Sequence, residues 1–151
     1  MFNHMKSLHY ATLRKAQDAA VWLNFKHKQD DDFKSLAVLH GANDDFVLLE
    51  EWEAKEMEIP ALELPTSYAN ITYPHIQSIK SDVDPLTHWL EIFGSFSVMK
   101  ADYLRFILET KLSLEQVVRY ELVARGLNKQ GKRIGFDQAE RYWFGSNFDQ
   151  L

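Results

Sequence analysis

The chain has 151 residues, 46% apolar and 13% aromatic, which is enough core material for one globular domain over residues 1–151. It contains no cysteine, so disulfides, thiolate catalysis and cysteine-based zinc sites are excluded. No apolar run approaches the roughly 20 residues that span a bilayer, and the first residues do not resemble a signal peptide. We therefore expect a cytoplasmic protein without membrane association.

The first predicted element is a helix over residues 6–28. Small and apolar side chains recur there at steps of three and four residues, namely Leu8, Thr12, Ala16, Ala19, Ala20 and Leu23. No glycine or proline interrupts the pattern, and Lys26 and Lys28 suit the negative end of a helix dipole.

Residues 33–57 allow two interpretations. Asp32 suits an N-cap for a helix over 33–40, and Asp44 or Asp45 suits one for a second helix beginning at Phe46. The short apolar run 36–39 is equally consistent with a strand, because periodicity does not separate a short helix from a buried strand. We favour two helices and keep a β-hairpin over residues 33–52 as the alternative.

Residues 58–78 form a predicted irregular joint within the domain. Pro60, Pro65 and Pro74 interrupt this stretch, and polar turn-forming side chains accompany them. Prolines at this spacing are incompatible with one continuous helix.

The remaining sequence predicts a series of short helices, each with its own start or stop signal. Pro85 follows a possible N-cap at Asp84, and Gly94 is the expected stop of that helix. Ser97 is expected to open the next helix, whereas Ser113 and Asp137 each begin a capping-box pattern. The resulting fold class is mainly α, a compact single-domain bundle of about six to seven short helices.

Charge is distributed very unevenly along the chain. Residues 30–63 contain eleven carboxylates and two lysines, a net charge of −9, whereas the whole chain has a net charge of −5. Residues 1–29 carry +4 and residues 111–141 carry +3. Such an asymmetry bears on partners and association rather than on the fold.

The acidic block is the predicted binding surface for a basic protein partner. Complementary charge speeds association, and a tryptophan inside the block provides the kind of aromatic anchor on which interfaces depend. The predicted partner-binding residues are Asp31, Asp45, Glu50, Glu51, Trp52, Glu53 and Glu56. Helix capping accounts for the presence of some of the aspartates, but it does not account for the glutamates from Glu50 onward.

A basic and aromatic segment, residues 119–144, supports an alternative function in nucleic-acid association. The possible contact residues are Lys129, Lys132, Arg133 and Arg141, with several aromatic side chains nearby. Two further arginines have glutamates four residues earlier and are expected to pair within a helix. The sequence pI near 5.6 also weighs against a dedicated nucleic-acid domain.

Catalytic and metal-binding motifs are not evident. The chain lacks the glycine-rich phosphate-binding patterns and the G-x-S-x-G motif of hydrolases. His88 and Glu91 lie three residues apart, but no second copy completes a metal site of the helical-bundle kind. We therefore expect no enzyme activity, no metal and no cofactor, and the sequence does not specify an oligomeric state.

A small, acidic, aromatic-rich chain without catalytic motifs is similar in general character to bacterial immunity and inhibitor proteins. The acidic block, the tryptophan within it and the lack of a catalytic motif lead us to expect an immunity-like or antitoxin-like inhibitor that neutralises a basic toxin or nuclease-type protein by covering its working surface. The nucleic-acid-associated accessory protein remains the alternative function.

Overall fold

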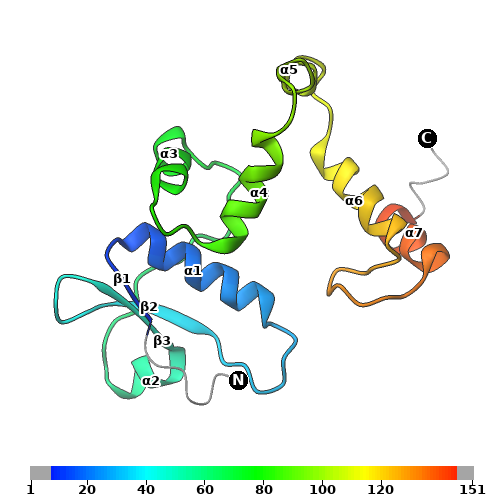
Figure 1. Cartoon of the computed structure of the whole chain (residues 1–151). Helices are drawn as coiled ribbons and strands as arrows, with labels where there is room; N and C mark the ends of the chain where they lie inside the picture. The colour runs from blue at the N-terminus through cyan, green and yellow to red at the C-terminus, as the bar shows by residue number, and fades with distance from the viewer. Residues whose placement is uncertain (1–7, 146–151) are drawn as a thin grey trace. The chain divides into compact units, whose positions relative to one another are not determined.

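The structure is a computed structural model that describes residues 8–145, with seven helices and three strands in that range (Figure 1). The described chain divides into two compact units, and the boundary lies between Ser95 and Phe96. In chain order the elements are β1 (Leu8–Tyr10), α1 (Leu13–Lys26), β2 (Leu36–His40), β3 (Phe46–Glu50), α2 (Glu51–Glu56), α3 (Tyr73–Ser81), α4 (Thr87–Ser97), α5 (Ala101–Thr110), α6 (Leu114–Ala124) and α7 (Phe136–Phe144).

A three-stranded antiparallel sheet makes the fold mixed α and β rather than a pure helical bundle. The strands lie in the order β1-β3-β2, with Val38 opposite Leu48 and Leu8 also opposite Leu48 on the other side. The hairpin interpretation of residues 33–52 is therefore correct, and the favoured helices over 33–40 and from Phe46 are wrong. Helical structure in this region is confined to α2, which follows β3 directly.

The sheet lies between α1 and α2, and this position explains why the sequence of β2 was ambiguous (Figure 1). Leu36 and Val38 pack in the core that contains α1, whereas Ala37 and Leu39 pack on the opposite side with Ala54 of α2. Successive side chains of a strand point to opposite faces. Because both faces of β2 are covered, all four residues are buried, and the alternation that identifies a strand is absent.

Backbone groups of β2 on the side away from β3 are hydrogen-bonded by two residues from outside the sheet. The Asn24 side chain of α1 accepts from Leu36 N–H at 2.8 Å and donates to the Leu36 carbonyl at 3.2 Å. Leu62 N–H donates to the Val38 carbonyl at 2.8 Å and forms an isolated bridge there. These contacts attach α1 and the chain after α2 to the edge of the sheet.

The first predicted helix is confirmed over most of its length but begins later than expected. Residues 8–10 form β1, and Thr12 is the N-cap of α1, with its hydroxyl accepting from Lys15 N–H at 3.3 Å. The predicted apolar face contributes Ala16, Ala19 and Ala20 to the core, where their small side chains permit close packing on the sheet. Residues 6 and 7 lie outside the described range.

Residues 57–72 contain no helix or strand apart from the isolated bridge at Leu62, and α3 begins at Tyr73, inside the range 58–78 of the predicted joint. Pro74 occupies the first turn of α3, where a missing N–H is tolerated. The boundary between the two units falls after Ser95, outside the predicted joint.

Only some of the later helices begin and end where the local sequence signals predict. Ser113 caps α6, as predicted, by accepting from Gln116 N–H at 3.2 Å. Gly94 does not stop α4, which continues to Ser97, and α5 begins at Ala101 instead of Ser97. The predicted cap at Asp137 is also wrong, because Gly135 is the N-cap of α7 and Asp137 lies in its first turn.

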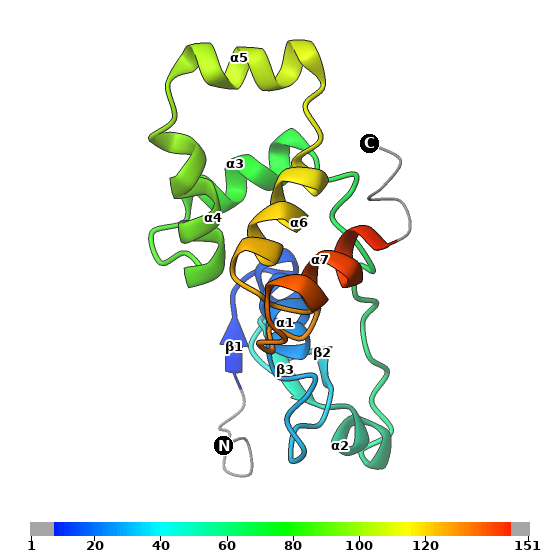
Figure 2. The ribbon, with the colours of Figure 1, turned by 90° about the vertical axis from the view of Figure 1, so that its right-hand side faces the viewer.

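In the second unit α6 and α7 are in contact and are connected by a loop over residues 125–135 (Figure 2). Trp143 donates its indole N–H to the Leu127 carbonyl at 2.7 Å, and Arg119 donates to the Trp143 carbonyl at 3.3 Å. Gly126 has φ +69° and packs against Gly135, which is 3.3 Å from the position a Cβ would take. Helix α5 contributes no buried residue. Within residues 8–145 no helix has the length and apolar character needed to cross a bilayer.

Candidate functional site

Five of the predicted partner-binding residues lie together at the end of β3 and on α2. We call Glu50, Glu51, Trp52, Glu53 and Glu56 the α2 acidic surface. Glu51 and Glu56 are exposed, and Trp52 is 48% exposed. The Trp52 indole N–H donates to the Glu50 carboxylate. Ala54 is buried against the sheet, so α2 is fixed on its inner side and presents its acids on the outer side.

The two predicted aspartates are not part of α2. Asp45 precedes Phe46 at the start of β3, whereas Glu50 is at the opposite end of that strand. His9 Nδ1 lies 2.7 Å from Asp45 Oδ2, and this hydrogen bond lowers the pKa of Asp45. Asp31 is exposed in the turn that follows α1. The structure therefore separates Asp45 from the α2 acidic surface and gives it a structural partner.

The hairpin turn explains the position of Asp45. Gly41 N–H donates to the Asp45 carbonyl at 2.8 Å, and a Cβ on Gly41 would lie 1.9 Å from the Asp45 carboxylate. Only a glycine at this position lets the carboxylate fold back over the turn. The role of Asp44 or Asp45 as a helix cap is wrong, because a turn and a strand replace the expected helix.

The predicted nucleic-acid residues lie in the second unit. Lys129, Lys132 and Arg133 occupy the loop between α6 and α7, which we call the basic loop, and Arg141 is on α7. All four are exposed. Asn128 fixes the loop, because its side-chain oxygen accepts from the N–H groups of Gln130 and Lys132 at 3.0 Å.

The arginines expected to pair within α6 do so. Arg119 lies 2.8 Å from Glu115, and Arg125 lies 2.8 Å from Glu121. Within residues 8–145 no ion pair involves Lys129, Lys132 or Arg133. Their charges are therefore not neutralised by a neighbouring acid of the described chain.

A buried polar site is centred on Asp18, a residue for which the sequence predicts no functional role. This α1 residue is 2% exposed, and its carboxylate accepts from three side chains. The Tyr68 hydroxyl is 2.8 Å away, His75 Nε2 is 2.8 Å away and the Trp89 indole nitrogen is 3.2 Å away. We call these four residues the Asp18 network.

The Asp18 network joins α1 to the segment before α3, to α3 itself and to α4. A buried carboxylate is costly unless hydrogen bonds replace its hydration, and three donors do so here. Burial and the hydrogen bond to Asp18 raise the pKa of Tyr68, so the phenol stays protonated as a donor. The proton on His75 Nε2 faces Asp18, which leaves Nδ1 free for other interactions.

Two surface cavities flank the Asp18 network, and both include Arg14 and Asp18 in their walls. The first has a volume of about 390 Å³ and lies toward Lys15 and Trp89. The second has a volume of about 560 Å³ and includes Tyr68 and His75, and we call it the His75 pocket. Asp18 therefore contributes to the walls of both cavities although it is almost fully buried.

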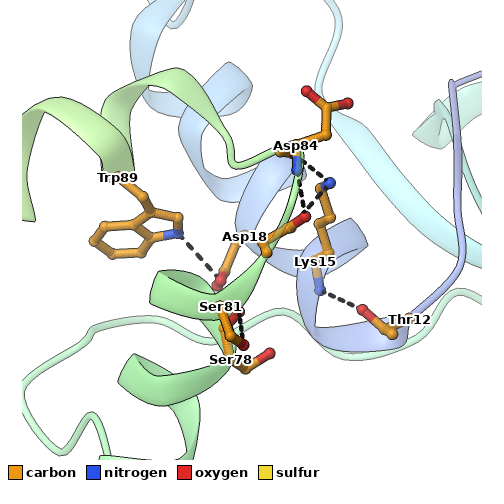
Figure 3. A network of polar contacts seen from close by, with 8 residues as sticks. Thr12, Lys15, Asp18, Ser78, Ser81, Asp84 and Trp89 are labelled. Atoms are coloured by element: carbon orange, nitrogen blue, oxygen red, sulfur yellow. Dashed lines mark hydrogen bonds and ion pairs between the residues drawn. The ribbon is translucent and has the colours of Figure 1, made fainter.

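Lys15 occupies one wall of the first cavity and connects α1 to the turn between α3 and α4 (Figure 3). Its ammonium group lies 3.0 Å from the Asp82 carboxylate and donates to the Asp84 carbonyl at 2.7 Å. Asp84 N–H donates to Asp82 at 2.9 Å, and this hydrogen bond, together with Lys15, lowers the pKa of Asp82. Because Lys15 has these partners, it reinforces the cavity wall and is not free to bind a ligand.

His88, which lies three residues before Glu91 in the sequence, has an aromatic environment in the structure. His88 stacks on Trp22, with ring centroids 4.5 Å apart and planes at 5°. Its Nδ1 is buried without a hydrogen-bond partner, and burial lowers the pKa of the ring. Across residues 8–145 no cluster of three or more histidine, aspartate or glutamate side chains is arranged to hold a metal ion.

Comparison of the chain with protein-family models, with curated proteins and with solved structures gives no match. The functional argument therefore depends on the geometry of this chain. One feature of the sequence could have drawn attention to Asp18 itself: it is the only acid in α1 and lies between the small residues Ala16 and Ala19 of the predicted apolar face. Its partners are 50 to 71 residues away in sequence, so no local pattern identifies them.

Proposed function

We propose that this chain is a non-catalytic protein-binding module that binds a basic protein through the α2 acidic surface. The kind of protein we infer is an immunity-like or antitoxin-like inhibitor that neutralises a toxin or nuclease-type partner. The observation that carries this proposal is the half-exposed Trp52 placed among four glutamates on a helix anchored to the sheet.

The geometry around Trp52 supports a preformed anchor. Its indole N–H donates to Glu50, which restricts the orientation of the ring before any partner binds. Ordering a side chain in advance reduces the entropy lost on binding. Tryptophan is also enriched among the residues that contribute most to protein interfaces.

The acids around Trp52 supply the charge expected for a basic partner. Glu51 and Glu56 are exposed and make no ion pair within the described residues. Opposite charge on two surfaces raises the association rate and disfavours partners of the same sign. We therefore expect binding to weaken as salt rises through the concentrations at which the screening length falls to about 8–10 Å.

A matched pair of charge reversals tests this proposal. The purified chain and a Glu51→Lys/Glu56→Lys variant are used as bait in a lysate of the cells that make the protein, and captured proteins are quantified by mass spectrometry. The control is Asp102→Lys/Glu109→Lys, which makes the same charge change at exposed positions of α5. We expect a basic protein to be captured by the wild type and the control, and lost from the α2 variant.

The partner obtained in this way permits a second, quantitative measurement. Trp52→Ala should weaken its binding by at least about tenfold, since truncating an aromatic residue at an interface hot spot typically costs about 2 kcal/mol or more. Equal binding by the wild type and the Glu51→Lys/Glu56→Lys variant would contradict the proposal, as would a captured partner of acidic charge.

The basic loop favours a second candidate function, nucleic-acid association. Its three basic side chains are exposed, and no acid of the described chain pairs with them. The backbone turn at Asn128 holds them on one short loop. Lysine and arginine contacts to phosphate provide affinity without base specificity and make it depend on salt.

Fluorescence anisotropy with labelled single-stranded and double-stranded DNA and RNA tests this second function. A Lys129→Ala/Lys132→Ala/Arg133→Ala variant should weaken binding similarly for every sequence and reduce the salt dependence by about three phosphate contacts. The control is Arg105→Ala, an exposed arginine on α5. Absence of binding by the wild type at low salt would reject this function.

A further inference from the structure

We propose that the His75 pocket binds a small anion of the carboxylate or phosphate class, held between the Arg14 guanidinium and Nδ1–H of a His75 imidazolium. This site involves the Asp18 network and is independent of the α2 acidic surface. It gives the chain a ligand that the proposed protein-binding function does not require.

The first argument concerns the two nitrogens of His75. Nε2 lies 2.8 Å from the Asp18 carboxylate, and the side chain is 14% exposed. Nδ1 makes no hydrogen bond within residues 8–145, and it is not among the buried polar atoms without a partner. Nδ1 is therefore accessible, in a residue that forms part of the wall of a cavity of about 560 Å³.

The second argument is that Asp18 fixes the orientation of this ring. The Asp18 carboxylate is 2% exposed and lies 2.8 Å from Nε2, so Nδ1 is on the side of the ring that faces away from it. In a complex with an anion the ring donates from both nitrogens, Nε2–H to Asp18 and Nδ1–H to the ligand. The buried carboxylate thus orients the ring, and the bound anion provides the second acceptor.

The third argument is the position of Arg14. It precedes Asp18 by four residues on α1, so the two side chains lie on the same face of the helix. Arg14 is exposed, belongs to the wall of the His75 pocket, and makes no ion pair within the described residues. An arginine without an acidic partner is a ready bidentate site for a carboxylate or a phosphate.

The charged residues that line the pocket have opposite effects on a bound anion. Arg14 and a charged His75 attract an anion, whereas Glu63 repels it. The Asp18 charge is compensated by its three donors, and Tyr68 is neutral because its pKa is raised. Removing the Glu63 charge should therefore strengthen anion binding, a result that a merely structural role of this network does not predict.

The test is an NMR titration of the full chain with sodium phosphate and, separately, with sodium acetate, following the ring resonances of His75. We expect saturable shifts in the wild type and a loss of affinity of about tenfold in Arg14→Gln, which removes one charge-assisted contact. Glu63→Gln should bind more tightly than the wild type. Both exposed substitutions leave the Asp18 network in place, and circular dichroism verifies the fold.

Arg133→Gln is the matched control, because Arg133 is also exposed and makes no ion pair within the described residues. Its affinity should equal that of the wild type. Saturation by phosphate alone assigns the site to phosphorylated ligands, and saturation by acetate alone assigns it to carboxylates. No saturable shift of His75 with either anion, or equal losses in Arg14→Gln and Arg133→Gln, would overturn the proposal.

Discussion

The two units of this chain bury their apolar residues to very different extents. The first unit has a sheet with apolar residues packed on both faces, and its core includes the fully buried Leu36, Leu39 and Leu48. In the second unit the buried described residues are only Val123, Gly126 and Ala139. Leu108 is 80% exposed there and Tyr120 is 68% exposed.

The units also differ in charge. The first carries eight basic and fifteen acidic residues, a net charge of −7, whereas the second carries nine basic and seven acidic residues, a net charge of +2. The chain thus combines a buried apolar core in the first unit with helices in the second unit whose apolar side chains are largely exposed. Core substitutions should consequently have large effects in the first unit, and backbone contacts should matter more in the second.

The largest expected effect is on the sheet of the first unit. Leu48→Ala should lower the free energy of unfolding by about 3 kcal/mol, because it leaves a cavity beneath α1. The measurement is urea unfolding followed by circular dichroism. Leu108→Ala, at an exposed position of α5, should change the value by less than about 0.5 kcal/mol. Similar losses in the two variants would remove the contrast between the units.

A somewhat smaller loss is expected at Asp18. Asp18→Asn replaces an acceptor-only carboxylate by an amide that offers one oxygen to three donors, so at least one buried donor loses its partner. We expect a loss of about 2 kcal/mol in the free energy of unfolding. Asp31→Asn, in an exposed turn, is the control and should be neutral. A neutral Asp18→Asn would show that the network does not stabilise the first unit.

In the second unit the critical position is Gly126. Gly126→Ala places a side chain at φ +69° and 3.3 Å from Gly135, and should destabilise the α6–α7 pair by about 1 to 2 kcal/mol. Hydrogen exchange of the α6 and α7 amides measures this effect locally. Gly94→Ala is the contrasting substitution, since nothing lies within 4 Å of the added Cβ and alanine favours a helix. Unchanged exchange in Gly126→Ala would contradict the prediction.

The smallest expected effect is a pH dependence from His88. Burial lowers its pKa from the ordinary value of 6.5, so the unfolded chain binds more protons than the folded chain just below that pH. The free energy of unfolding should therefore fall as pH decreases through 6.5. His88→Phe, which keeps the stacking on Trp22, should flatten this dependence, whereas His40→Gln should not. An unaltered slope in His88→Phe would assign the dependence to other groups.

The parts of the fold that were predictable depend on neighbours in sequence. The Ser113 cap requires a partner only three residues away, and the small face of α1 repeats within one helix. The strands were less certain because both faces of β2 are covered, which removes the alternation of polar and apolar residues. Gly94 failed as a stop signal because nothing in α4 crowds it or requires a positive φ there.

The candidate sites were likewise predictable only where their residues are neighbours in sequence. The α2 acidic surface was evident as a run of glutamates around Trp52, although the sequence also assigned Asp45 to it. Asp45 contacts His9, which is 36 residues away. The Asp18 network depends on contacts made only after α3 and α4 fold against α1, so its residues carried no shared spacing.

The side chain of Asn24 has a consequence for how this protein behaves at high concentration. An open strand edge is a template on which another chain can add a strand, the first step toward aggregation. The Asn24 side chain accepts from the Leu36 N–H and donates to the Leu36 carbonyl, as the backbone of a neighbouring strand would. Leu62 N–H donates to the Val38 carbonyl. The most buried strand of residues 8–145 is thereby protected from intermolecular pairing by a single polar side chain and one loop residue.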